Sequence, residues 1–156
     1  MTSTYKPGRA IFQHAINQGD VESCAYPEAS GQSFKAGQAV YLASGLTTVC
    51  ADNAVVVFGF TETDASTAAT TTPTITVSPI RIGDVYEMRS LVAETPDYTM
   101  IGKKYSIHQV SNVTRVHTAD QTTPAVVIVG LVDTATAGGR VLVTFLPTVL
   151  QYHVGA

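Results

Sequence analysis

Four histidines and one serine–histidine pair are the residues of this 156-residue chain whose chemistry suits catalysis or metal binding. His14, His108, His117 and His153 do not stand two or four positions from one another or from a cysteine, the spacing that preassembles a metal site on one strand or helix. Ser106 and His108 share one face of a predicted strand, but no third group that would orient the imidazole is identifiable. The sequence therefore predicts no catalytic residues and no metal ligands.

The carboxylates and glycines also lack a catalytic or ligand-binding pattern. Asp84 and Glu87 fall on opposite faces of a regular strand, so they do not form an acid–base pair. Asp64 and Asp133 follow apolar segments without a D-x-D-x-D calcium loop. No G-x-S-x-G elbow, G-x-G-x-x-G turn or Walker loop is present. We therefore predict a protein that is not an enzyme and that uses no cofactor.

The composition favours a protein whose surface is largely consumed by contacts. Only 13% of residues are charged, against about 25% in an average soluble domain. The net charge of −3 and the scattered basic residues argue against nucleic acid as a partner. Cys24 and Cys50 are too few for a disulfide framework or a zinc site, and we interpret them as reduced thiols. With no membrane-length apolar run and no signal-peptide pattern, we expect a soluble homo-oligomer made in the cytoplasm, without membrane contact.

Short strands separated by turns predict an all-β fold. Residues 33–64 contain an alternating strand, a turn at Ser44-Gly45, a second strand and the apolar run at 55–58, which we expect to be a strand covered on both faces. Residues 125–131 and 140–145, joined through Gly138-Gly139, predict a β-hairpin. Because closure removes exposed sheet edges, these strands indicate a small antiparallel β-barrel or β-sandwich.

The N-terminal part of the chain is less regular. We assign residues 1–31 to an extended N-terminal arm and residues 32–156 to the barrel or sandwich domain, with 24–32 rich in turns. Residues 10–16 fit either a helical turn or an extended segment. The arm's aromatic residues either anchor a partner or pack on the chain's own barrel. Residues 61–73, rich in Thr and Ala, are predicted to form a surface loop.

Several segments resemble the head decoration, or capsid cement, proteins of tailed bacteriophages. They are residues 34–42 (FKAGQAVYL), 54–66 (AVVVFGFTETDAS), 82–88 (IGDVYEM) and 139–147 (GRVLVTFLP). The resemblance implies a small β-barrel or sandwich on the outer surface of the virion capsid. It also implies assembly as trimers, or as dimers in some members, and an N-terminal arm that reaches the major capsid protein.

On this basis the first hypothesis is a capsid decoration protein that bridges major capsid protein subunits and reinforces the shell. Its capsid-binding residues in the arm would be Tyr5, Lys6, Pro7, Arg9, Ile11 and Phe12. The alternative is a virion fibre or tail β-domain that binds a host-surface glycan, although the chain contains no tryptophan.

Overall fold

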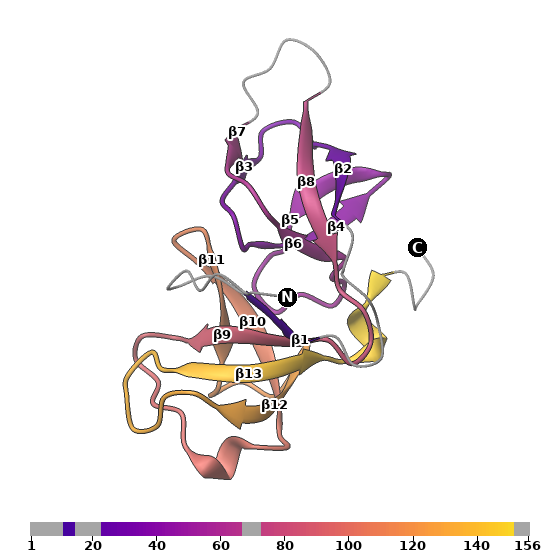
Figure 1. Ribbon diagram of the computed structural model, residues 1–156. Helices are drawn as coiled ribbons and strands as arrows, with labels where there is room; N and C mark the ends of the chain where they lie inside the picture. The colour runs from indigo at the N-terminus through magenta and orange to yellow at the C-terminus, as the bar shows by residue number, and fades with distance from the viewer. Residues whose placement is uncertain (1–10, 15–22, 67–72, 152–156) are drawn as a thin grey trace.

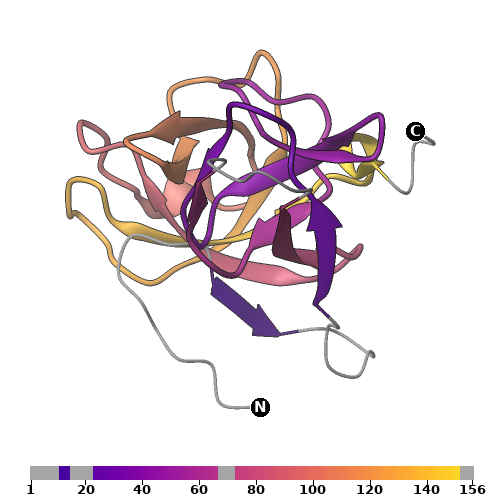
Figure 2. The same ribbon diagram turned by 90° about the horizontal axis from the view of Figure 1, so that it is seen from above.

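The computed structural model describes residues 11–14, 23–66 and 73–151, which form two β-structures stacked on one another (Figure 1). Strands β2 to β8 make the first half, and β9 to β13 make a barrel to which β1 (Ile11–His14) is added. Viewed from above, the first half lies over the barrel (Figure 2). Apart from the short 3-10 helices η1 (Tyr98–Met100) and η2 (Pro147–Val149), the named elements are all strands, which confirms the all-β prediction. No helix within the described part of the chain is long and apolar enough to cross a bilayer.

The first half is a five-stranded antiparallel sheet in the order β2-β8-β6-β4-β5, accompanied by the small pair β3-β7. The predicted turn at Ser44-Gly45 is confirmed, and both residues have the positive φ that a two-residue hairpin needs. Phe34, Val40, Ile75 and Val77 form a small core of this half. The strands are β2 (Cys24–Pro27), β3 (Ser33–Phe34), β4 (Ala39–Ala43), β5 (Leu46–Val49), β6 (Gly59–Thr61), β7 (Ala65–Ser66) and β8 (Thr74–Pro79).

The second half is a closed barrel in the order β9-β11-β10-β12-β13, with β13 pairing back to β9. The predicted hairpin is confirmed as β12 and β13, and Gly138 adopts φ 65° in its turn. The barrel closes through one parallel strand pair. Arg89 and Ser90 of β9 pair with Arg115 and Val116 of β11. The strands are β9 (Val85–Ser90), β10 (Lys104–Val110), β11 (Val113–His117), β12 (Val126–Leu131) and β13 (Arg140–Phe145).

An aromatic cluster joins the two halves. Phe60 of β6 packs against Tyr86 of β9 and Phe145 of β13, with ring centroids 4.9 and 5.7 Å away. All three side chains are buried in a core that also contains Val57 from the first half and Leu150 beyond β13. The two halves therefore share one hydrophobic core.

Three local expectations are wrong. The run at 55–58 is not a doubly covered strand, because Val55 is 62% exposed and only an isolated bridge from Val57 to Leu150 forms there. The segment expected to be rich in turns contributes β2 (Cys24–Pro27), which pairs with β8. The loop predicted at 61–73 begins with Thr61, which is buried in β6, and its residues 65–66 form β7.

Gly59 and Gly130 follow similar apolar runs in the sequence but have different surroundings. A Cβ at Gly59 would overlap the Ser78 carbonyl oxygen and lie 2.8 Å from Val77 Cγ1. A Cβ at Gly130 would lie 3.3 Å from Leu142 Cδ1, the movable end of a flexible side chain. Gly59 therefore allows β6 to approach β8 closely, whereas a methyl group at Gly130 requires only a small shift of the Leu142 side chain.

We predict that Gly59→Ala lowers the free energy of unfolding by about 2–3 kcal/mol, because the β8 backbone must move. Gly130→Ala, the matched control, should cost less than about 1 kcal/mol. Urea unfolding of both variants measures the difference. Equal destabilisation by the two substitutions would contradict the assigned packing of β6 on β8.

Arg140 and Asp133 form the strongest ion pair at the end of the barrel. Arg140 donates from Nε to Asp133 Oδ2 at 2.7 Å and from Nη2 to Oδ1 at 2.9 Å, a bidentate arrangement. The Arg140 side-chain and backbone hydrogen bonds lower the pKa of Asp133 from 3.8 to about 2. The folded state thus favours the ionised carboxylate.

The Asp133 pair should make stability depend on acid pH. Because the folded-state pKa is depressed, its contribution is complete above pH 3.8 and is lost as the pH falls toward about 2. We expect a loss of about 1 kcal/mol over this range, which Asp133→Asn should not show. Thermal unfolding of both proteins across the range tests this, and a wild-type-to-variant difference independent of pH would refute it.

Candidate functional site

Of the six predicted capsid-binding residues, Ile11 and Phe12 belong to the described structure, where they lie in β1 (Ile11–His14). The backbone of Ile11 pairs with Glu87, and that of Phe12 pairs with Tyr86, at the edge of β9. Tyr5, Lys6, Pro7 and Arg9 lie outside the described residues. For residues 10–16 the sequence allowed either a helical turn or an extended segment. The structure shows that residues 11–14 are extended and pair with the barrel strand β9.

The place where β1 attaches follows from the barrel's closure. One edge of β9 pairs with β13 over residues 85–89, while the other edge meets β11 at Arg89 and Ser90. This leaves the start of that second edge, around Val85 and Glu87, for β1 to cover. β1 therefore extends the barrel's sheet by one strand at this edge of β9.

A polar cluster lies on the outer face of the β10–β11 hairpin. His108 of β10 and His117 of β11 are diagonal neighbours, with His117 Nδ1 3.0 Å from His108 Nε2. Asp120 follows in the next turn, and one ligand atom from each of these three residues lies within 4.8 Å of the others. The structure thus brings together two histidines that are nine positions apart in the sequence.

Carboxylates face the outer nitrogens of both rings. His117 Nε2 lies 3.2 Å from Glu94 Oε1, and His108 Nδ1 lies 3.7 Å from Asp52 Oδ2. Glu94 also accepts hydrogen bonds from the backbone nitrogen and hydroxyl of Thr118 at 2.7 and 2.8 Å. Asp52 accepts from the backbone nitrogen of Gln109 at 2.7 Å. The protein therefore holds both carboxylates in place independently of the imidazoles.

The groups that face the His108 imidazole, which the sequence did not reveal, are Asp52 and Asn53, whereas Asp120 bonds the hydroxyl of Ser106. The fully buried Ser106 hydroxyl donates to Asp120 Oδ2 at 3.2 Å, and the Thr122 backbone nitrogen donates to Oδ1 at 2.8 Å. Hydrogen bonds from the Thr122 backbone and side chain hold the pKa of Asp120 below its usual range. Because the Ser106 hydroxyl is enclosed and bonded to Asp120, it is not placed for attack on a substrate.

Asp84 and Glu87 have structural surroundings. Asp84 is buried, which raises its pKa, and its Oδ2 accepts from the Arg81 backbone nitrogen at 3.0 Å. Glu87 lies 3.4 Å from Arg140 and extends the ion pair at the barrel end. These contacts give each carboxylate a role in the fold.

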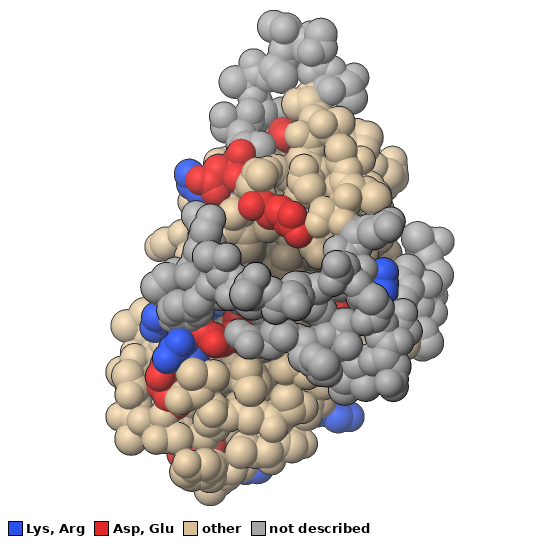
Figure 3. All heavy atoms as spheres, viewed as in Figure 1, with Lys and Arg blue, Asp and Glu red and all other residues tan. Residues whose placement is uncertain are grey.

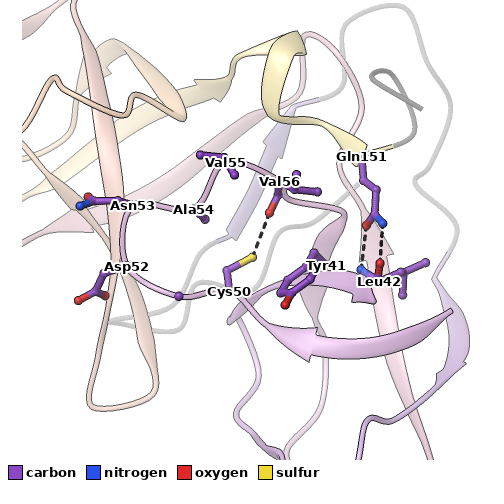
Figure 4. A pocket seen from close by; sticks show the side chains of 10 residues that line it. Tyr41, Leu42, Cys50, Asp52, Asn53, Ala54, Val55, Val56 and Gln151 are labelled. Carbon is purple, nitrogen blue, oxygen red and sulfur yellow. Dashed lines mark hydrogen bonds between the residues drawn. The ribbon is translucent and has the colours of Figure 1, made fainter. Parts of the chain in front are cut away.

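A hollow of about 540 Å³ lies beside the histidine cluster, on the first half (Figure 4). Tyr41, Cys50 and Val56 are among the residues that line it, and the Asp52 and Asn53 side chains at its rim point away from Cys50. Burial raises the pKa of Cys50 to about 12, so its thiol stays protonated and unreactive at neutral pH. The other cysteine, Cys24, is exposed and also free.

One sequence signal could have revealed the histidine pair. Ser111 and Asn112 both have positive φ and form a two-residue turn between β10 and β11. That turn pairs Val110 with Val113 and brings His108 and His117 onto the same face.

Comparisons of the chain with models of protein families and with curated proteins found no match.

Proposed function

We propose that this chain is a decoration protein of a tailed bacteriophage head, which binds the outer capsid surface and bridges major capsid protein subunits. The proposal draws on the resemblance in sequence, and a group of exposed apolar side chains at one barrel end is the observation that carries it. The segments that carry the resemblance supply β4, β6, β9 and β13, so they belong to the scaffold. The contacts with the shell come from the barrel end and from the arm.

The barrel end around η1 presents five large hydrophobic side chains to solvent. Backbone hydrogen bonds bring their loops together, from Gly102 to Ile128 at 2.7 Å and from Gly138 to Glu94 at 2.8 Å. In Figure 3 this lower end of the molecule carries few charged atoms. We call it the η1-end surface, and its members, with exposed fractions, are Val92 (64%), Tyr98 (73%), Ile101 (42%), Val129 (45%) and Val132 (40%).

The apolar side chains of the η1-end surface would be more stable in contact with a protein partner than in contact with water. Exposed apolar residues are common singly, but a group of them at one end of a small domain marks an interaction site. Tyr98 is a rigid aromatic side chain of the kind that contributes most to binding at protein interfaces. A capsid offers many copies of one surface, so modest contacts by each subunit add up to strong reinforcement of the shell.

The arm provides the second contact in this proposal. β1 fixes Ile11 and Phe12 on the barrel wall, and Tyr5, Lys6, Pro7 and Arg9 precede that anchor. From there the arm would extend across a neighbouring capsid subunit and add main-chain hydrogen bonds. The protein would act as a homo-oligomer, with a trimer favoured, after synthesis in the host cytoplasm.

The double variant Tyr98→Ser, Val129→Thr should reduce binding to purified heads lacking this protein by about tenfold or more, because it removes apolar contacts at the η1-end surface. The matched control is Leu46→Thr on β5, which is 40% exposed on the other half. Co-sedimentation followed by copy-number measurement gives both affinities. Wild-type affinity in the double variant would show that this surface is not the contact.

The arm should contribute separately. Tyr5→Ser combined with Arg9→Gln is expected to weaken head binding by about tenfold while leaving the unfolding temperature unchanged, since both residues precede β1. The same co-sedimentation assay, together with thermal unfolding, measures this. Unchanged binding would assign the contact to the barrel alone, and a glycan array with strong hits would favour the fibre-domain alternative.

A further inference from the structure

We propose that His108, His117 and Asp120 bind a divalent transition-metal ion of the zinc class. His108 Nε2, His117 Nδ1 and an Asp120 carboxylate oxygen would be its ligands. This inference stands apart from capsid binding, because none of the three residues belongs to the η1-end surface or to the arm.

The separation of the two imidazole nitrogens fits a shared ion. They lie 3.0 Å apart, and two nitrogens on one tetrahedral zinc ion are separated by roughly 3.3 Å. The rings meet at 70° with centroids 4.3 Å apart, so they converge from two strands instead of stacking. A small movement of either ring completes the geometry.

The carboxylates behind the rings select the nitrogens that would face the ion. Glu94 lies against His117 Nε2 at 3.2 Å, and Asp52 lies against His108 Nδ1 at 3.7 Å. A carboxylate that accepts the outer N–H leaves the inner nitrogen with its lone pair, the arrangement that metal-binding histidines adopt in proteins. His117 has such a partner at hydrogen-bond distance, and the Asp52 carboxylate lies at ion-pair distance from His108 Nδ1.

Asp120 supplies an anionic ligand from outside the hairpin. Its two oxygens accept from Thr122 and Ser106, which fixes the carboxylate near the rings. Together with Asp52 and Glu94 it gives the cluster three carboxylates. The nearest cation in the strand register is Arg115, opposite His108, and its Nη1 donates to the Ser90 carbonyl at 2.9 Å.

Without the ion, a proton occupies its place. Because Glu94 faces His117 Nε2 as an acceptor, we assign the hydrogen of His108 to Nε2, from which it donates toward His117 Nδ1, with Asn53 Oδ1 3.0 Å away as a second acceptor. On metal binding, His108 exchanges this proton with water and carries its hydrogen on Nδ1, facing Asp52. A neutral His108 remains neutral, so the exchange releases no net proton. The three protein ligands leave a fourth position for water.

Isothermal titration of the purified, chelator-treated full chain with zinc chloride at about pH 7.5 tests the proposal, since neutral imidazoles are required. We expect one ion per chain with a micromolar or tighter dissociation constant. Cobalt(II) should give the visible absorption of a tetrahedral nitrogen–oxygen site. A wild-type protein that binds zinc only at millimolar concentration overturns the proposal.

Variants distinguish this site from other histidines. His117→Gln and Asp120→Asn should each weaken zinc binding by about tenfold or more, and in the second the amide oxygen still accepts from Thr122. His14→Gln and His153→Gln are the matched controls and should bind as the wild type does. Circular dichroism in chelator verifies that each variant folds. Wild-type affinity in both ligand variants, or its loss in a control, would refute the assignment.

Glu94 is a positioning residue in this scheme. Glu94→Gln should weaken zinc binding by about tenfold while the cobalt absorption band persists, because all three ligands remain. A role limited to holding the Thr118 turn would lower the unfolding temperature without changing zinc affinity. That outcome would refute the part assigned to Glu94.

Discussion

The packing of Phe60 on Tyr86 and Phe145 is the interaction on which the rest of the structure depends. β6 places Phe60 in the barrel core, and Gly59 beside it lets the strand lie close to β8. Neither half has another aromatic cluster of this size within the described residues, and the first half alone has a core of only four buried side chains. Its stability therefore comes largely from packing on the barrel, because burial of apolar surface is the dominant favourable term in folding and aromatic side chains bury much of it.

This junction also builds the histidine cluster. Once the halves are joined, the 52–53 loop of the first half reaches the edge of β10, where the Asn53 backbone nitrogen donates to the Ile107 carbonyl. Asp52 then faces one ring of the histidine pair, while Glu94 faces the other from within the barrel half. The cluster thus combines groups from both halves, while the three proposed metal ligands all belong to the barrel half.

The sequence predicted those parts of the fold that local rules determine. Alternation and turn residues identified β4, β12 and β13 with their turns, because side-chain period and positive φ are properties of a few neighbouring residues. The predictions that were wrong concern residues whose conformation depends on contacts with distant parts of the chain. Val55 is apolar yet exposed, and β2 forms because β8 offers an edge to Cys24–Pro27. The histidine pair depends on register between two strands, which spacing along one strand does not report.

Closure of the barrel restricts how this protein can associate with a partner. A closed barrel has no free edge, and β1 covers the remaining open part of β9, so strand addition onto the barrel is blocked there. Within the described residues, β1 and the end strands of the other sheet, β2 and β5, each have one neighbour in their sheet, so these edges stay available for strand addition. Few charges are available for long-range attraction, since only 13% of residues are charged. In the proposed function, association uses apolar contact at the η1-end surface and main-chain pairing by the arm, and both favour a large, fixed surface over a small ligand.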